Sequence, residues 1–293
     1  MSIGVVLNVF KRPENVLRQL EGLSTQTLKP DVILIWVNGC EFSLPDSLDS
    51  FQRDSIVVIK SSENLGVWAR FTAALNLHTT FINVLDDDII PGPKWLEHAR
   101  YHCLKLNGLI GGRGVRFYSR QSYNPIDHWG WKKPNEEALE VDIIGHSWFF
   151  RREWLNEIWN IEWRDSFLTS GEDMNLSFKL LTKLNIRSYV APHPLNDLDC
   201  WSNVDGEKVG SDTAAISRGK EAYLKFDRAL SYFTENESLK LFYERDEGAK
   251  TLSIRYQSNF WRRIGFAKLA KHLLGSRRYQ ALGERLKNRG FHF

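Results

Sequence analysis

Short apolar runs alternate with amphipathic segments along the first part of the chain. Four apolar runs predict buried strands over residues 3–9, 32–37, 55–59 and 81–85. Three helices are expected among them, one opened by Pro13 and two over residues 66–77 and 93–106. Strands that alternate with helices form right-handed βαβ units. We therefore expect an α/β fold with a Rossmann-like, mainly parallel sheet flanked by helices.

Beyond residue 108 the pattern shifts towards β-structure. Two strands are expected over 109–117 and 141–151, on either side of a polar, aromatic loop. Further helices and a strand follow at 152–159, 172–184 and 187–191. Residues 192–219 have the composition of a loop, and helical segments close the chain. We expect one domain over residues 1–235 and a helical, basic C-terminal extension over 236–293.

The strongest chemical signal is the acidic triplet Asp86-Asp87-Asp88, which directly follows an apolar strand. Ligands of parallel sheets bind beyond the carboxyl ends of the strands. Adjacent carboxylates raise one another's pKa unless a cation lies among them, and Mn²⁺ or Mg²⁺ takes carboxylate oxygens. The alternative is a solvated acidic turn, although the sequence returns at once to apolar residues.

Two further acidic residues and one histidine carry weaker signals. Glu172 and Asp173 stand where a loop enters a helix. They either cap that helix, whose dipole favours acids in its first turn, or supply a general base to a cleft. His193 lies between two prolines after the last predicted strand. It is either a structural histidine or a third protein ligand of the metal.

Basic and aromatic residues suggest how a substrate is held. Arg12, Asn64 and Arg70 lie at edges where a phosphate and a base would lie, although either arginine alone could be a surface residue. Six tryptophans fall within 35 residues. Trp154 and Trp159 have helical spacing, which favours core packing. Aromatic rings also pack against the apolar faces of sugars, and Trp129 and Trp131, in a polar loop, are better candidates for such a wall.

Composition adds limits to this picture. The 293 residues are 42% hydrophobic and 26% charged, enough to bury a core without cross-links, which excludes a disulfide scaffold. The three cysteines are far apart and form no CxxC motif, so we expect reduced thiols. No apolar stretch is long enough to span a bilayer, and no signal peptide is recognised. We therefore expect a cytoplasmic protein. The net charge is +3, yet residues 259–293 hold nine Lys and Arg against one acid. This segment predicts attachment to an anionic membrane surface, on the inner face of the cell membrane, or a docked helix with a solvated basic face.

Two nucleotide motifs are excluded. The glycine-rich segment 108–114 runs into a predicted strand rather than opening a helix, so it is no dinucleotide fingerprint. No GxxxxGK[ST] sequence occurs, which excludes the P-loop nucleotide hydrolases.

The order of the motifs resembles that of glycosyltransferases of the GT-A fold. Phe-Lys-Arg-Pro follows the first strand, Asn-Leu-Gly-Val-Trp-Ala-Arg spans 64–70, and the acidic triplet and Gly-Glu-Asp at 171–173 come after. The resemblance covers roughly residues 3–195 and is to family 2 in general layout. The chain is also similar to the exostosin-like family 64 in its Asp-Asp-Asp, its Trp-Val-Asn at 36–38 and its Glu-Asp.

The resemblance implies transfer of a sugar from a nucleotide-diphosphate donor, with UDP favoured, to a glycan or lipid-linked acceptor in polysaccharide or lipopolysaccharide biosynthesis. Asp88 would bind Mn²⁺ or Mg²⁺, joined by His193, and Asp173 would be the catalytic carboxylate with Glu172 beside it. The implied nucleotide-sugar site comprises Phe10, Arg12, Asn38, Asn64, Arg70, Asp86 and Asp87. The acceptor wall would comprise Trp129, Trp131, His146 and Trp148. No nucleic-acid partner is expected.

Family 2 enzymes invert the anomeric centre with the aspartate as base, whereas family 64 enzymes retain it, and we expect inversion. Two other functions stay open at this point. A sugar nucleotidyltransferase uses a similar sheet and metal site, but Phe10–Glu14 lacks the glycines typical of its signature. A non-catalytic carbohydrate- or membrane-binding module is supported only by the tryptophans and the basic segment.

Overall fold

The computed structural model describes residues 1–44, 54–124, 126–131, 133–159, 170–205, 220–235 and 238–250. The chain divides into two compact units, Met1–Phe242 and Tyr243–Phe293. Most of the second unit, including the basic segment 259–293, lies outside the described residues, so its predicted role in membrane attachment stays a prediction. The expected boundary at residue 235 also stays a prediction. All the strands of the described residues lie in the first unit.

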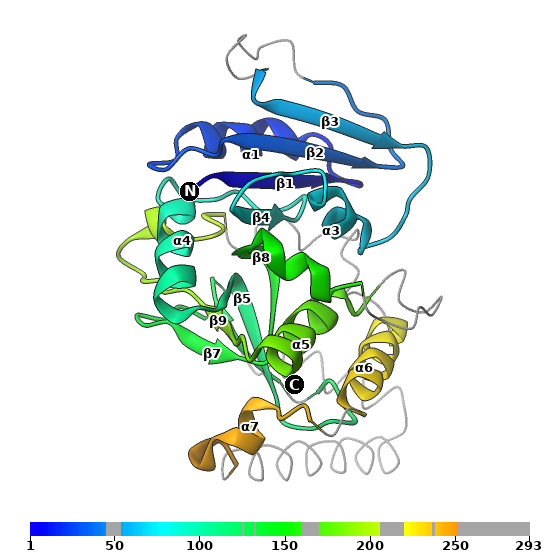
Figure 1. Ribbon diagram of the computed structural model, residues 1–293, viewed down its shortest axis with the longest axis vertical. Coiled ribbons are helices and arrows are strands. Elements are labelled where there is room, and N and C mark those ends of the chain that lie inside the picture. The colour runs from blue at the N-terminus through cyan, green and yellow to red at the C-terminus, as the bar shows by residue number, and fades with distance from the viewer. Residues whose placement is uncertain are drawn as a thin grey trace, which may run out of the picture. The chain divides into compact units, whose positions relative to one another are not determined.

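A single sheet organises the described part of this unit (Figure 1). Its strands follow the order β3-β2-β1-β4-β8-β5-β9-β7, and β6 pairs with β5 outside this path. The strands are β1 (Ile3–Val9), β2 (Val32–Asn38), β3 (Ile56–Ser61), β4 (Phe81–Leu85), β5 (Leu109–Phe117), β6 (Ile126–Gly130), β7 (Leu139–Val141), β8 (Ile143–Arg151) and β9 (Ser188–Val190).

Helices connect and cover these strands. In the first unit they are α1 (Asn15–Ser24), α3 (Ala69–Ala74), α4 (Trp95–Leu106), α5 (Glu172–Leu184) and α6 (Lys220–Thr234), with 3₁₀ turns η1 (Arg152–Glu157) and η3 (Leu198–Cys200). A further helix, α7 (Phe242–Arg245), begins at the boundary and belongs to the second unit. α3 packs on β1 and β2, α4 on β5 and β8, and α5 on β8. The α/β fold predicted from the alternation of strands and helices is confirmed.

The sheet has a parallel half and a mixed half. β3, β2, β1 and β4 run parallel, as expected for βαβ units, so their carboxyl ends meet at one edge. β8 then lies antiparallel between β4 and β5. Its register places Ser147 opposite Leu85, at the carboxyl end of β4. Because β8 runs the other way, residues in its middle join the edge where the parallel strands end.

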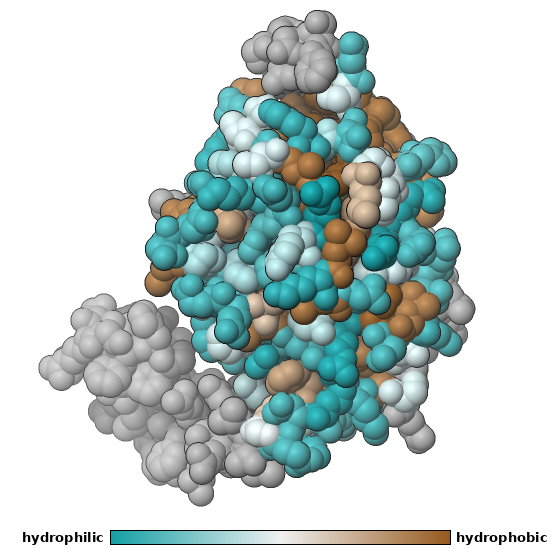
Figure 2. All heavy atoms as spheres, turned by 60° about the vertical axis from the view of Figure 1, so that its left-hand side comes forward, coloured by the Kyte–Doolittle hydropathy of each residue, from teal (hydrophilic) through white to brown (hydrophobic). Residues whose placement is uncertain are grey.

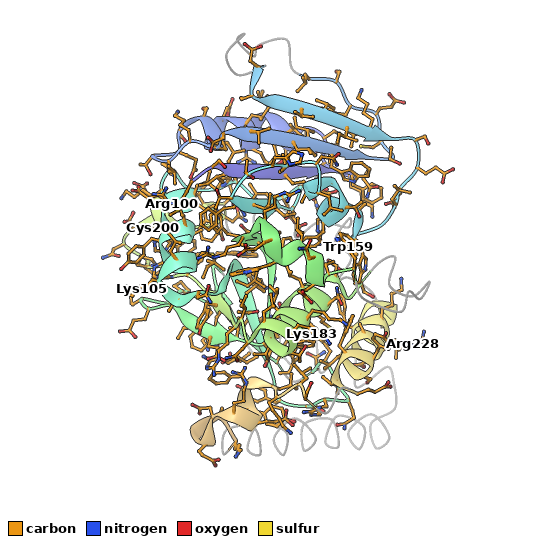
Figure 3. All side chains as sticks on the ribbon, viewed as in Figure 1. Arg100, Lys105, Trp159, Lys183, Cys200 and Arg228 are labelled. Atoms are coloured by element: carbon orange, nitrogen blue, oxygen red, sulfur yellow. The ribbon has the colours of Figure 1, made fainter. Side chains whose placement is uncertain are left out.

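The structure corrects two local expectations. The predicted loop over 119–140 contains β6 and the start of β7, and the helix expected over 152–159 is the 3₁₀ turn η1. Trp154 is 3% exposed and lies in the core, as expected. Trp159, also expected in the core, is 36% exposed and lies just after η1 (Figure 3). A 3₁₀ turn has three residues per turn, so helical spacing does not keep both rings on one face.

One face of the described part of the chain is largely polar. Hydrophilic residues cover most of the face shown in Figure 2, and apolar residues are scattered among them. Single exposed apolar side chains are normal in globular proteins. Within the described residues, no helix is both long and apolar enough to cross a membrane.

Candidate functional site

The acidic triplet lies at the carboxyl end of β4, where α1 fixes its backbone. Gln19 donates from Nε2 to the carbonyl oxygens of Asp86, at 2.7 Å, and of Ile89, at 3.0 Å. Asn15 donates to the carbonyl oxygen of Asp87 at 2.9 Å. Both amides are buried on the face of α1 that also carries its apolar residues. A buried polar side chain needs a partner, so these two residues hold the triplet in a fixed turn.

Arg12 neutralises part of the triplet. Its Nη1 lies 2.5 Å from Oδ1 of Asp87 and 3.7 Å from Oδ2 of Asp88, and its side chain is largely buried. The sequence placed Arg12 in a nucleotide site as a phosphate ligand. In the structure its guanidinium is committed to carboxylates of this chain.

Arg70 on α3 joins the triplet to the second acidic motif. Its Nη1 lies 2.7 Å from Oδ1 of Asp86, and its Nη2 lies 2.5 Å from Oε1 of Glu172. The side chain is 6% exposed and its guanidinium lies 4.6 Å from the ring centre of Trp148. Burial would lower the pKa of Arg70, but Asp86 and Glu172 raise it, so the arginine is charged. The guanidinium of Arg70 therefore links two acidic motifs that are far apart in the sequence.

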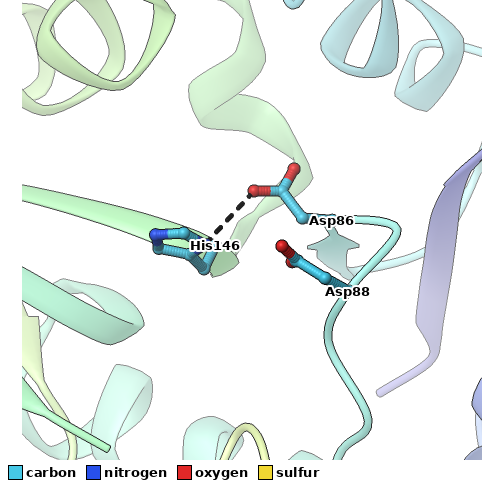
Figure 4. Close-up of side chains that lie close together, drawn as sticks. All are labelled: Asp86, Asp88 and His146. Atoms are coloured by element: carbon cyan, nitrogen blue, oxygen red, sulfur yellow. Dashed lines mark ion pairs between the residues drawn. The ribbon is translucent and has the colours of Figure 1, made fainter. Parts of the chain in front are cut away.

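Asp86, Asp88 and His146 form a group able to hold a metal ion (Figure 4). Each offers one ligand atom, and these atoms lie within 4.8 Å of one another. Nδ1 of His146 lies 3.7 Å from Oδ2 of Asp86, and the backbone of Asp86 donates to the carbonyl oxygen of His146 at 3.0 Å. Oδ1 of Asp88 is buried without a hydrogen-bond partner among the described residues. An orphaned, buried carboxylate oxygen fits a hard divalent cation.

The protonation of these carboxylates supports the same conclusion. The pKa of Asp86 is raised to about 8, chiefly by burial, with Arg70 opposing this effect and Asp88 and Asp87 adding to it. Burial also raises the pKa of Asp88 to about 6, helped by Asp87 and opposed by Arg12. The site therefore lacks positive charge for its carboxylates, which a divalent cation would supply.

Asp173 stands in the first turn of α5, partly exposed. Its Oδ1 accepts a hydrogen bond from the backbone of Met174 at 2.7 Å. Burial raises the pKa of Asp173 to about 7, and the neighbouring Glu172 raises it as well. The two acids divide their roles, since Glu172 binds Arg70 while Asp173 has a pKa suited to proton transfer near neutral pH.

His193 does not join the metal group, contrary to the expectation from its sequence. Nδ1 lies 2.7 Å from the carbonyl oxygen of Ala191, and Nε2 lies 3.1 Å from the hydroxyl of Ser202. The side chain is fully buried between the rings of Trp95 and Trp201. Burial lowers its pKa to about 4. With both nitrogens engaged, His193 is a structural histidine, and His146 lies where a histidine beside the carboxylates was expected.

Comparison with known proteins agrees with this geometry. The sequence matches the family model described as Glycosyl transferase family 2 over residues 4–159, more than half of the chain. The chain belongs to glycosyl transferase family 2. The comparisons do not show the expected similarity to the exostosin-like family 64. The α/β architecture expected for the GT-A fold is confirmed.

No curated protein sequence matches this chain. Among solved structures, 295 chains match. One is the crystal structure of S. aureus TarS, at 17% sequence identity and a TM-score of 0.45. The match covers 66% of the present chain and 37% of that chain, so the present chain spans well under half of its length.

The predicted acceptor wall of this family 2 protein comes together only in part. Trp131 and His146 are in edge-to-face contact, with ring centres 5.7 Å apart. Trp148 is 1% exposed, donates to the carbonyl oxygen of Ile144 and packs in the core, so it cannot line a substrate wall. Trp129 pairs with Gly114 in the β5–β6 register and points to the face opposite His128.

At the expected nucleotide edge, Asn38 is hydrogen-bonded to the loop that follows β3. Asn38, at the end of β2, donates to Oδ1 of Asn64 at 3.0 Å and accepts from the backbone of Leu65 at 2.8 Å. Gly39 has φ +72°, and a Cβ there would lie 2.4 Å from the backbone nitrogen of Asn64. Glycine is thus required for this close approach. Asn38 shapes the loop rather than standing free towards a ligand.

A cavity of about 530 Å³ opens beside the same edge. It is bounded by the segment after β1 and by the residues that follow β2, namely Pro13, Glu14, Val16, Leu17, Glu41, Phe42 and Ser43. Phe10 precedes this segment and is half-buried, with Lys11 over its ring. The cavity and the acidic group therefore both lie along the carboxyl edge of the parallel half.

Proposed function

We propose that this family 2 glycosyltransferase moves a sugar from a nucleotide-diphosphate donor, with a UDP-sugar favoured, to a hydroxyl of a glycan or lipid-linked acceptor. The observation that carries the proposal is the buried Oδ1 of Asp88, beside Asp86 at the end of β4, for which the described residues offer no hydrogen-bond partner. In a family 2 fold, a carboxylate in this state is suited to the cation that accompanies a diphosphate.

Asp88 and Asp86 would hold Mn²⁺ or Mg²⁺. Nε2 of His146 accepts a hydrogen bond from Arg113, so Nδ1 carries the hydrogen. This N–H group faces Asp86 and would orient its carboxylate. The cation would neutralise charge on the leaving diphosphate when bound. Asp87 is held by Arg12 and stabilises the turn. The cavity beside β1 and β2 would take the nucleoside.

Asp173 would act as the base that deprotonates the acceptor hydroxyl, giving inversion in a single displacement. Arg70 and Glu172 fix the start of α5 and so the position of Asp173. Assembly of a surface polysaccharide or lipopolysaccharide is the process we favour. The basic segment 259–293 would bring the enzyme to an anionic membrane carrying a lipid-linked acceptor.

Asp88→Asn tests the metal-dependent donor site. The substitution keeps the size of the side chain and removes the charge that a divalent cation needs. We expect the affinity for UDP, measured by calorimetry with Mn²⁺, to fall about a hundredfold or more. Without Mn²⁺, wild type and variant should bind UDP equally weakly. The matched control Asp199→Asn changes an exposed carboxylate near α4 and should bind UDP like the wild type. Unchanged affinity in Asp88→Asn would contradict the proposal.

Transfer should depend on pH through Asp173. A base works only when ionised, and a pKa of about 7 leaves Asp173 mostly protonated below neutral pH. The initial rate should therefore rise as the pH increases through about 7 and level off above it. Rates of UDP release from a donor sugar across this range, with saturating donor, measure the effect. A rate that is already maximal in mild acid would contradict the assignment.

A further inference from the structure

Four side chains gather beside the metal group. One of them, His146, belongs to that group, and the other three have no role in the function proposed above. Arg113 on β5 lies between two histidines, with Nη2 3.1 Å from Nδ1 of His128 and Nη1 3.4 Å from Nε2 of His146. Trp131 adjoins them, with its ring centre 5.4 Å from the guanidinium carbon of Arg113. We name these four residues the Arg113 cluster.

The local backbone is built to bring this cluster together. The register of β5 shifts between Gly111 and Arg113, where it pairs with β8. Gly130 ends β6 at φ +104°, and a Cβ there would lie 2.1 Å from the carbonyl oxygen of Gly112. Only glycine allows β6 to pass so close to β5 and turn Trp131 towards Arg113.

The polar groups of the cluster act as hydrogen-bond donors. A guanidinium can only donate, so Nδ1 of His128 and Nε2 of His146 accept, and each imidazole carries its hydrogen on the other nitrogen. The indole nitrogen of Trp131 also only donates, and it is buried without a hydrogen-bond partner among the described residues. A lining of donors around a fixed positive charge is complementary to the oxygens of an anion.

The position of the cluster indicates which substrate it meets. The expected nucleotide edge belongs to β1, β2 and β3, on one side of Asp86, whereas the cluster belongs to β5, β6 and β8, on the other side. The two sides of the metal group are thus chemically different. Trp131 adds an aromatic face of the kind that packs against sugar rings.

We infer that the Arg113 cluster binds a phosphate group carried by the sugar acceptor. The inference rests on the proposed function, since it concerns the acceptor side of the same reaction. Arg113 supplies charge and paired donors, His128 adds a donor beside it, and Trp131 contacts the sugar that bears the phosphate. The enzyme should therefore distinguish a phosphorylated acceptor from its neutral counterpart.

Glucose 6-phosphate and glucose are suitable probes, measured by calorimetry with Mn²⁺ and UDP at saturation so that the donor site is filled. Wild type should bind the phosphate more tightly than the neutral sugar. Arg113→Gln should weaken glucose 6-phosphate binding about tenfold or more, because a hydrogen bond to a charged group is lost. His128→Ala removes a second donor and should act in the same direction. The affinity for UDP should stay within about twofold in His128→Ala, because His128 is outside the metal group. It should also do so in Arg113→Gln, because the glutamine amide can still donate to Nε2 of His146.

Lys133→Gln is the matched control. This lysine follows β6 closely, but its ammonium lies over the ring of Trp129, on the opposite face. It should bind both UDP and glucose 6-phosphate like the wild type. Equal loss in Lys133→Gln would mean non-specific attraction and would overturn the inference. Retained phosphate binding in Arg113→Gln and His128→Ala, or no preference in wild type, would overturn it too.

The affinity for UDP separates the failure of this inference from the failure of the proposed function. If Arg113→Gln weakens UDP binding instead, the cluster serves the donor diphosphate, so the inference fails while the proposed function stands. If wild type does not bind UDP with Mn²⁺ at all, the proposed function itself fails.

Discussion

Asp173→Asn should reduce transfer about a thousandfold while leaving the binding of Mn²⁺ and UDP unchanged, because a general base contributes within this range. The asparagine keeps an oxygen able to accept from the backbone of Met174, so the first turn of α5 is preserved. It has no basic lone pair for the acceptor proton. The measurement pairs the initial rate of UDP release with the affinity for UDP by calorimetry.

The control for this substitution is again Asp199→Asn, an equivalent change on an exposed turn. It should keep both rate and affinity. Two results would contradict the role of Asp173. Full transfer by Asp173→Asn would remove it from catalysis. Loss of UDP affinity together with the rate would place it in the donor site instead.

The sequence predicted the parallel half of the fold well because three of its strands, β1, β2 and β4, are buried on both faces. Such strands are continuous apolar runs, and β1 and β4 have the bounds that the pattern predicted. β6 was missed, since its five residues are half-polar and it pairs with β5 alone. A short strand of this kind is stabilised by its partner rather than by its own pattern. The insertion of β8 between β4 and β5 is likewise a long-range event.

The candidate site was also predictable only in part: the sequence indicated the acidic triplet but not the histidine beside it. The rule that ligands bind at the carboxyl ends of strands singled out the triplet, two of whose members lie in the group with His146. It could not choose between His146 and His193, because the antiparallel placement of β8 decides which histidine reaches Asp86. A local signal was available for Gln19, a polar residue within the apolar stripe of its helix. Buried amides in such stripes bind backbone, and this one holds the triplet.

The partner of an arginine is also a tertiary property. Arg70 was expected to bind a nucleotide, yet its guanidinium lies between Asp86 and Glu172, over the ring of Trp148. A buried ion pair costs desolvation on both sides, and replacing the whole group with apolar residues can be neutral. Removing one partner is different, because it leaves buried charges without compensation. Removing Arg70 alone should therefore destabilise the folded state by more than the net contribution of its ion pairs.

Arg70→Met should therefore lower the free energy of unfolding by about 3–5 kcal/mol, the usual cost of breaking a buried pair from one side. Urea titration with a chelator present measures this, since no divalent cation can then replace the lost charge. The free energy of unfolding of Arg70→Lys should lie between those of wild type and Arg70→Met, because one ammonium group cannot bind both carboxylates as the two guanidinium nitrogens do. The control Arg187→Met breaks an exposed pair with Glu140 and should cost at most about 1 kcal/mol.

Glu172→Gln in the Arg70→Met background completes the test. If the uncompensated carboxylate causes the loss, neutralising Glu172 should restore part of the stability, so the two substitutions should be less costly together than the sum of their separate effects. Additive effects, or a loss in Arg70→Met no larger than in Arg187→Met, would show that the bridge between the two acidic motifs does not stabilise this fold. The acidic triplet and α5 would then hold their positions through the surrounding core alone.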